Sequence, residues 1–355
     1  MIERKINLMS KIKGLKVPVF LASDDNYAPF LAVTLKSIFE HASPENFYEI
    51  IILSTDLSKE NEEKINALKT DNSSIRFVSM KEQVEKIKSI FPIRDYYSIE
   101  TYYRIFIADL FPQYDKVVYL DCDVVTLVDI ADMYRVRLGN KLVAAAHEDV
   151  ADILEIYRKY IRYALDCNPK KYFSAGILLM NTKLFRKEQF AKKFINLMSK
   201  YTFRITQDED YLNVLCKGRI RKLDLGWNRG AFPLGSFDEK ELKIIHYKLN
   251  WKPWKVDDAS YQEHFWNYVE KTPYKEEILR KKSEYTDERK QKDAADFQRL
   301  LCWVAEDAED PNNYRNAEVM KGFRKIRRNV LHVMGKVSYV GRFFMYVGRS
   351  IFRTA

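Results

Sequence analysis

Two aspartates separated by a single residue follow a short apolar segment in the first half of the chain. Residues 116–120 (KVVYL) lead directly into Asp121, Cys122 and Asp123. An apolar strand with this ending places two carboxylates where the backbone leaves a sheet, and their oxygens are ligands that Mg²⁺ and Mn²⁺ accept. A cation held there can neutralise a diphosphate. A solvated turn with two acids is the alternative, but the preceding strand and the aliphatic flanks favour the metal site.

A metal site needs further ligands, and the chain has five histidines. His246 follows the short strand-like run 242–245 and opens the segment 246–254 (HYKLNWKPW), which is rich in aromatic residues and lysine. An added imidazole favours Mn²⁺ over Mg²⁺, although Fe²⁺ also fits, and Lys252 can then meet a phosphate oxygen. His147, near another predicted strand end, is the second candidate. A structural histidine at a strand end is the alternative for His246.

The common glycine-rich phosphate loops are absent from the sequence. It contains neither G-x-x-x-x-G-K-[ST] nor G-x-G-x-x-G, so phosphates must be held in another way. A metal with acidic ligands favours nucleotide-sugar chemistry or nucleotidyl transfer over ATPases and dehydrogenases. A nucleotidyltransferase making an NDP-sugar is expected to carry a glycine-rich basic loop after its first strand, where this chain has residues 23–26 (SDDN). A binding-only pseudoenzyme on a membrane is a third hypothesis, and the combination of Asp121, Asp123 and His246 argues against it.

Strand and helix signals alternate through the first 150 residues. Short apolar runs predict strands at 17–22, 48–54, 75–80, 116–120 and 142–147. Helical periodicity and capping predict helices at 27–42, at 58–69 with Ser58 as its cap, and at 98–110. This order predicts an α/β fold with a mostly parallel central sheet, in which ligands bind beyond the carboxyl ends of the strands. After about residue 250 the alternation ends and charged helical segments follow.

Six blocks of the sequence, in order, resemble the family 8 glycosyltransferases. This retaining group includes bacterial lipooligosaccharide galactosyl- and glucosyltransferases and glycogenin. The resemblance covers about residues 17–270 and implies a Rossmann-like GT-A nucleotide-diphospho-sugar transferase fold. It also implies transfer of a hexosyl group, galactose or glucose, from a UDP-sugar to a saccharide acceptor in lipopolysaccharide, capsule or other surface-glycan synthesis. The matching blocks are 22–27, 98–104, 119–123, 173–181, 207–213 and 246–254.

The resemblance also implies roles for individual residues. Asp121, Asp123 and His246 are expected to bind Mn²⁺, with Mg²⁺ as the second choice. The residues expected to bind the donor are Ala22, Asp24, Asn26, Tyr27, Arg104, Cys122, Ala175, Gly176, Asp208, Leu249 and Lys252. Those expected to take part in catalysis are Asp121, Asp208, Glu209 and Arg104.

The chain departs from the family pattern at two positions beside the donor sugar. Ser174 stands where the family often has Asn, and Glu209 stands where it often has Gln. These departures leave the donor sugar open between galactose and glucose. Glu209 has two candidate roles, as a nucleophile or as a hydrogen-bond acceptor for a sugar hydroxyl, and the second is favoured.

The net charge of +10 is concentrated at the C-terminal end of the sequence. From residue 319 onward there are nine Lys or Arg and no acid, interleaved with apolar and aromatic residues, whereas the preceding chain is nearly neutral. This pattern predicts an amphipathic segment at an anionic membrane surface. A nucleic-acid arm or a dimer-forming helix are the alternatives, and the high apolar content favours the membrane. The predicted organisation is an N-terminal segment 1–16, a catalytic domain 17–270, a helical extension 271–318 and a tail 319–355.

The remaining composition bears on the compartment. The four cysteines are scattered and form no C-x-x-C pair, which favours a reducing setting. The sequence begins without a signal-peptide pattern and has no apolar stretch of about 20 residues. We therefore expect a cytoplasmic protein, peripheral on the inner face of the cell membrane, with a lipid-linked saccharide acceptor and no nucleic-acid partner. The oligomeric state is not predicted.

Overall fold

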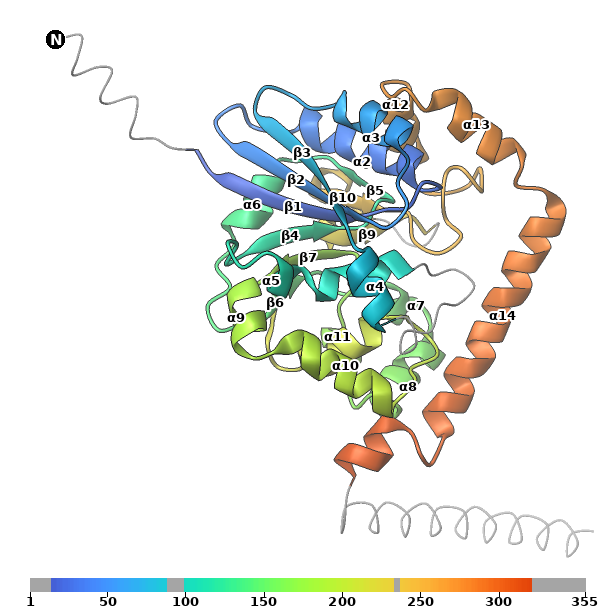
Figure 1. The fold of residues 1–355 in the computed structure, drawn as a ribbon. Helices are drawn as coiled ribbons and strands as arrows, with labels where there is room; N and C mark the ends of the chain where they lie inside the picture. The colour runs from blue at the N-terminus through green and yellow to red at the C-terminus, as the bar shows by residue number, and fades with distance from the viewer. Residues whose placement is uncertain (1–13, 88–98, 233–236, 321–355) are drawn as a thin grey trace, which may run out of the picture.

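The computed structural model describes residues 14–87, 99–232 and 237–320. Within these ranges the chain forms a seven-stranded sheet of order β3-β2-β1-β4-β7-β6-β8 and a three-stranded sheet of order β5-β10-β9 (Figure 1). In the large sheet, β7 runs antiparallel to both of its neighbours and the other pairings are parallel. The predicted α/β class with a mostly parallel sheet is confirmed. The strands are β1 Lys16–Ala22, β2 Phe47–Ser54, β3 Ser73–Ser79, β4 Val117–Leu120, β5 Val124–Thr126, β6 Val143–Ala145, β7 Ile177–Met180, β8 Ile220–Lys222, β9 Arg229–Gly230 and β10 Ile244–His246.

Helices cover both faces of the large sheet. Figure 1 shows α2, α3 and α12 over one face and α8 to α11 over the other. The α-helices are α2 Ala28–Glu40, α3 Lys59–Asn66, α4 Lys81–Ile87, α5 Ile107–Leu110, α6 Ile130–Arg135, α7 Val150–Ile153, α8 Glu155–Tyr163, α9 Thr182–Lys187, α10 Phe190–Lys200, α11 Glu209–Leu215, α12 Gln262–Val269, α13 Lys275–Ser283 and α14 Asp287–Glu309. Short 3₁₀ helices occupy Ile99–Ile105, Pro169–Lys171, Leu225–Asn228 and Glu239–Glu241, and a π-helical turn occupies Arg315–Val319.

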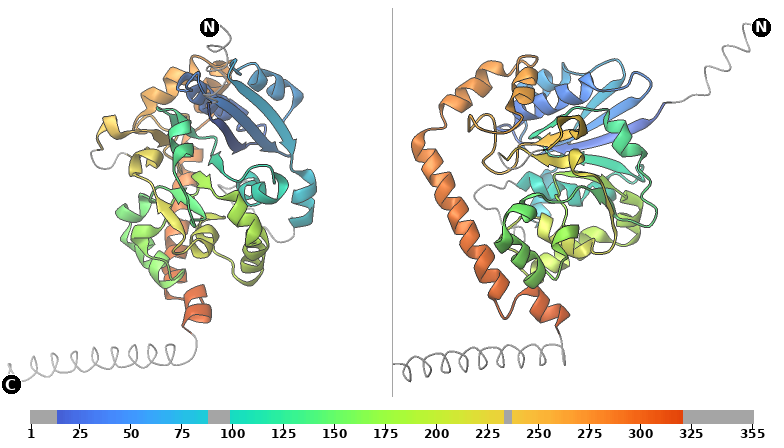
Figure 2. Two further views of the ribbon diagram at one scale, coloured as in Figure 1. Left: turned by 90° about the vertical axis from the view of Figure 1, so that its left-hand side faces the viewer. Right: turned by 180° about the vertical axis from the view of Figure 1, so that it is seen from behind.

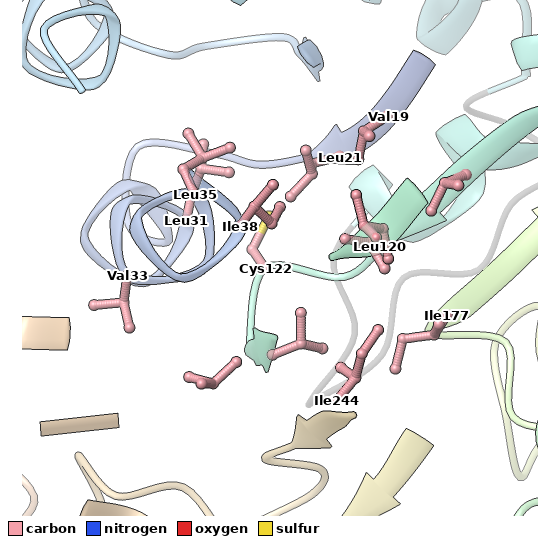
Figure 3. Packing of buried hydrophobic residues seen from close by; sticks show 14 of the residues in the cluster. Val19, Leu21, Leu31, Val33, Leu35, Ile38, Leu120, Cys122, Ile177 and Ile244 are labelled. Atoms are coloured by element: carbon pink, nitrogen blue, oxygen red, sulfur yellow. The ribbon is translucent and has the colours of Figure 1, made fainter. Parts of the chain in front are cut away.

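The central strand β1 is buried on both sides. Val19 and Leu21 point into a cluster with α2, whereas Phe20 points into the cluster on the opposite face. Figure 3 shows the first of these layers, with Leu31 and Leu35 of α2 near β1. Strand side chains alternate between faces, so a strand covered on both sides reads as a continuous apolar run. This double burial explains the apolar segment that predicted the strand.

Two predicted elements differ from the structure in detail. The segment predicted as one helix over 98–110 forms a 3₁₀ helix at Ile99–Ile105 followed by the short α5. The Nε atom of Arg104 donates to the carbonyl oxygen of Thr101 (2.9 Å) within this segment. The predicted cap is confirmed, because the hydroxyl of Ser58 accepts a hydrogen bond from the backbone of Asn61.

The helix α14 runs along the outside of the molecule, as Figures 1 and 2 both show. It lies within residues 271–318, which the sequence predicted to be helical. In the described parts of the chain, no helix combines the length and the apolar character that crossing a membrane requires. Most of the predicted N-terminal segment 1–16 and of the predicted tail 319–355 lies outside the described residues.

Candidate metal and donor site

The Asp-Cys-Asp turn connects β4 to β5 and is held from three sides. The backbone N–H of Asp121 donates to the carbonyl of Gly176 (2.8 Å). The buried hydroxyl of Thr34 on α2 contacts the carbonyl oxygens of Cys122 (3.0 Å) and Val124 (2.8 Å). The Sγ of Cys122 lies 3.0 Å from the carbonyl oxygen of Ala22, which ends β1. Contacts from three elements therefore fix the direction of the two carboxylates.

Strand pairing brings His246 to this turn. In the antiparallel pair of β5 and β10, His246 lies opposite Val124. Its Nε2 atom is 3.2 Å from Oδ1 of Asp123 and 3.9 Å from Oδ2 of Asp121. One ligand atom from each of Asp121, Asp123 and His246 lies within 4.8 Å of the others. The structure thus brings together the three residues predicted to bind the metal.

The second candidate histidine is elsewhere. His147 contacts the carbonyl oxygen of Tyr172 through Nδ1 (2.8 Å) and a carboxylate oxygen of Asp152 through Nε2 (3.1 Å). These contacts occupy both ring nitrogens, and His147 is not part of the acidic cluster. These contacts give His147 a structural role at the end of its strand.

The donor set fits a divalent cation. Within the described residues, Oδ1 of Asp123 is buried beside Nε2 of His246 (3.2 Å) and, when that nitrogen carries no proton, accepts no hydrogen bond. An unsatisfied buried carboxylate oxygen is costly unless a ligand satisfies it. Nδ1 of His246 lies 2.9 Å from Oδ1 of Asn228. With its proton on Nδ1, the imidazole donates to this oxygen and presents Nε2 as a ligand. A Cβ at Gly176 would lie 2.3 Å from Cε1 of His246 and 2.6 Å from Oδ2 of Asp121. Gly176 therefore keeps this space clear.

Two buried cations pair with the acidic residues. The ammonium group of Lys252 pairs with Oδ2 of Asp123. The guanidinium of Arg104 lies 3.1 Å from both Asp121 and Asp208, donates to the carbonyl of Ala175, and packs over an aromatic ring. Arg104 thus connects the metal cluster to the residues expected at the donor sugar. Both cations are thus held in place by carboxylates of the site.

Three consecutive acids at the start of α11 have different surroundings. Burial raises the pKa of Asp208 to about 6, although Arg104 opposes the shift. Burial and the nearby charge of Glu148 raise the pKa of Glu209 well above its usual value, and one oxygen of Glu209 accepts the backbone N–H of Ala175 (2.8 Å). Asp210 is fully buried among hydroxyl groups. Only the first two line the cavity described next, so Asp210 has a structural position.

One cavity of about 690 Å³ joins these groups. Nearly all of the sequence-predicted residues line it. They are Ala22, Asp24, Tyr27, Arg104, Asp121, Cys122, Asp123, Ala175, Gly176, Asp208, Glu209, His246, Leu249 and Lys252. Asn26 is exposed and does not line the cavity, because the turn directs it away while the carboxylate of Asp24 accepts the N–H of Tyr27 (2.7 Å).

The sequence reasoning missed several residues of the site. Asn228 carries no local signal, because its approach to His246 depends on the pairing of β9 with β10. The pair of Glu148 and Lys248, whose charged atoms are 2.9 Å apart, also lines the cavity. A signal for this pair existed: Glu148 follows a predicted strand, as Asp121 does, and Lys248 lies two residues after His246.

Comparison with known proteins decides the family. Residues 18–258 match the profile of glycosyl transferase family 8. The chain belongs to this family. A putative glycosyltransferase of Haemophilus influenzae is 31% identical over 214 residues, covering 59% of this chain and 62% of that protein. A lipopolysaccharide 1,3-galactosyltransferase of Salmonella typhimurium is 25% identical over 244 residues, covering 65% of this chain and 71% of that protein.

A solved structure supports the same assignment for this family 8 member. The galactosyltransferase LgtC, in complex with donor and acceptor sugar analogs, matches with a TM-score of 0.61 at 27% identity, covering 72% of this chain and 96% of LgtC. The predicted GT-A fold and the predicted membership of family 8 are both confirmed. The chain spans less than two thirds of the length of the Haemophilus protein.

Proposed function

We propose that this family 8 member transfers a galactosyl or glucosyl group from a UDP-sugar to a saccharide acceptor, with retention at the anomeric carbon. The observation that carries the proposal is the cluster of Asp121, Asp123 and His246 inside a cavity that the predicted donor residues also line. The galactosyltransferase LgtC was solved with donor and acceptor sugar analogs, and this likeness supports a sugar donor and a saccharide acceptor here.

The proposed cofactor is Mn²⁺, with Mg²⁺ as the second choice. Asp121, Asp123 and His246 would hold it, since two carboxylates and one imidazole favour Mn²⁺ over Mg²⁺. Bound there, the cation supplies charge neutralisation for the diphosphate leaving group. The unsatisfied oxygen of Asp123 and the orientation of His246 by Asn228 support this assignment.

The chain's own residues perform the remaining tasks. We propose that Lys252 binds the diphosphate, and its position beside Asp123 in the same cavity supports this role. Arg104 pairs with both Asp121 and Asp208, and these ion pairs would keep the two carboxylates oriented while the donor binds. Ala22, Asp24 and Tyr27 form the end of the cavity proposed for uridine. Preorganised charges of this kind stabilise a transition state more than a ground state.

Retention can follow two routes. The acceptor hydroxyl can attack on the face that the leaving phosphate departs from, with the phosphate taking its proton. Alternatively, two inversions can pass through a covalent glycosyl intermediate, for which Glu209 is the candidate nucleophile. We favour the first route, because burial and the charge of Glu148 raise the pKa of Glu209 and so favour its neutral form. A neutral carboxyl donates a hydrogen bond to a sugar hydroxyl, as the amide of the family's usual glutamine does.

A panel of UDP-sugars tests the proposal. Purified protein is incubated with UDP-galactose, UDP-glucose and their N-acetyl counterparts, with Mn²⁺, Mg²⁺ or a chelator, and UDP release is measured. We expect Mn²⁺-dependent hydrolysis of UDP-galactose or UDP-glucose, and its loss in Asp123→Asn. Hydrolysis that persists in chelator would overturn the metal assignment, and failure to release UDP from every donor would overturn the transferase.

Surface-glycan synthesis is the proposed setting. The similarity to a lipopolysaccharide 1,3-galactosyltransferase supports it, as does the basic and apolar sequence of residues 319–355. We propose that this tail binds anionic lipid at the inner face of the cell membrane, where a lipid-linked acceptor is available. Flotation with vesicles of anionic and of neutral lipid, using the chain with and without residues 319–355, tests this. Binding to neutral vesicles alone, or flotation without the tail, contradicts it.

A further inference from the structure

The catalytic cavity extends past the donor residues to the helix α14. Asp293, Asp296, Phe297, Leu300, Leu301 and Val304 line the same cavity as the metal cluster. Their spacing of three and one residues places them on one face of the helix. α14 follows the segment 18–258 that matches the family. This wall of the cavity is therefore an addition to the matched region.

The C-terminal half of this wall is apolar, and α14 packs against α8, which with α7 contributes further apolar residues to the same cavity. Val150 on α7, Leu154 directly after it and Tyr157 on α8 line the cavity. The same cavity is lined by Phe297, Leu300 and Leu301 of α14. We call these six side chains the apolar compartment. Leu300 packs on a hydrophobic core cluster, whereas Phe297 and Leu301 are half-buried and belong to neither core cluster of the described residues. Packing within the hydrophobic core therefore does not explain why Phe297 and Leu301 are apolar.

Contacts at both ends hold α14 across the cavity. Near its start, a carboxylate oxygen of Asp293 accepts hydrogen bonds from Lys255 (2.7 Å) and Tyr285 (2.8 Å). Near its end, Arg204 pairs with Glu306 (2.9 Å) and with Asp307. Figures 1 and 2 show α14 running along the outside of the molecule. The compartment is a preformed part of the cavity.

The chemistry of the compartment identifies what it binds. Saccharide hydroxyls need hydrogen-bond partners when they leave water, and the valine, leucine and phenylalanine side chains of the compartment offer none. The hydroxyl of Tyr157, the polar group among the six side chains, already donates to the hydroxyl of Tyr172 (3.3 Å). Hydrocarbon gains free energy by burial there. We infer that the apolar compartment binds the hydrocarbon aglycone of the acceptor, so that the saccharide end lies at the metal and donor residues. The inference rests on the proposed function and names the class of acceptor: a glycolipid or another saccharide with an apolar aglycone.

Binding of alkyl glycosides tests the inference directly. Methyl, hexyl and octyl β-galactosides and β-glucosides, below their micelle concentrations, are titrated calorimetrically into the full chain with UDP and Mn²⁺ present. We expect the affinity to rise at least about tenfold from methyl to octyl. In the double variant Phe297→Ala, Leu301→Gln this gain disappears, while the affinity for the methyl glycoside is unchanged. Gln298→Ala, an exposed neighbour on α14 that does not line the cavity, is the matched control.

Two further measurements separate the possible failures. Thermal melting reports whether each variant is folded. If the double variant unfolds, Leu301→Gln alone, which keeps about the same side-chain volume, should still reduce the rise in affinity from methyl to octyl glycoside. Equal affinity along the alkyl series, no binding of any glycoside, or a gain that survives in the variants overturns the inference. Hydrolysis of the UDP-sugar without acceptor is measured on the same proteins. Its absence in the native chain counts against the proposed function, whereas native hydrolysis without an alkyl preference counts against the compartment alone.

Discussion

The imidazole of His246 is oriented by the side chain of Asn228, whose oxygen lies 2.9 Å from Nδ1. This contact directs Nε2 of the ring toward Asp123, 3.2 Å away. Partners in this position fix both the tautomer and the angle of a metal-ligating histidine. Asn228 precedes β9 and His246 ends β10, so the pairing of these two short strands sets the geometry of the metal cluster.

Replacing Asn228 tests this relationship. We expect Asn228→Ala to weaken Mn²⁺ binding about 10- to 100-fold, because the ring loses the partner that holds it. Calorimetric titration of the metal-free protein with Mn²⁺ measures the effect. Asn228→Asp, which keeps an acceptor oxygen, is the matched control and should bind within a few-fold of the native chain. Unchanged Mn²⁺ affinity in Asn228→Ala would show that the contact does not orient the ligand.

Gly176→Ala probes the space beside the cluster. The new methyl group would lie 2.3 Å from His246 and 2.6 Å from Asp121, so these side chains must move apart. We expect a loss of about 1–3 kcal/mol in unfolding free energy and at least about tenfold weaker Mn²⁺ binding. The control is Gly218→Ala, where φ is +75° and no atom lies within 4 Å. It should cost about 1–2 kcal/mol and leave metal binding intact, and equal effects of the two variants on metal binding would refute the argument.

Glu209→Gln distinguishes the two routes to retention. If the neutral carboxyl donates a hydrogen bond, the amide replaces it, and we expect turnover within about fivefold of the native value. Native turnover should also fall as the pH rises through the raised pKa of Glu209 and the carboxyl ionises, and the variant should lack that decline. Initial rates of the native chain and the variant across pH measure both effects. Loss of turnover in Glu209→Gln, together with a glycosylated Glu209 peptide found by mass analysis of the native chain, would instead establish the covalent route.

Asp210 should make stability depend on pH. Burial raises its pKa to about 6, although hydroxyl groups of Tyr160 and Tyr172 and the amide of Thr206 hydrogen-bond to it. The unfolded value is about 3.9, so between these values the folded chain holds a proton that the unfolded chain has released. The contribution is full below about pH 4 and is lost as the pH rises through 6.

Comparison with Asp210→Asn isolates this contribution. The unfolding free energy of the native chain, relative to that of the variant, should fall by about 2 kcal/mol between pH 4 and pH 7. Urea denaturation of both proteins at several pH values gives the difference, in which the effects of other titrating groups cancel. Parallel pH curves for the two proteins would contradict the assignment.

The sequence predicted the elements whose signals are local. The apolar run before Asp121 indicated a strand, and strands buried on both faces need such runs. Asp121, Asp123 and His246 were predicted as ligands because each follows a predicted strand and because the surrounding blocks resemble the family. Ser58 was identifiable as a cap because its contact reaches only three residues along the chain. The segment at 98–110 was less predictable, because its buried Arg104 makes tertiary contacts with Asp121 and Asp208 that local periodicity does not reveal.

The tertiary structure alone decided which distant segments meet. Asn228 reaches His246 through the pairing of β9 and β10, and α14 reaches the cavity because Lys255 and Arg204 hold it from separate parts of the chain. These contacts join residues far apart in sequence, and no local periodicity records them. The sequence by itself determined the chemistry available for a metal and a nucleotide-sugar. Only the folded arrangement decided how the histidine is oriented and that an apolar wall borders the site.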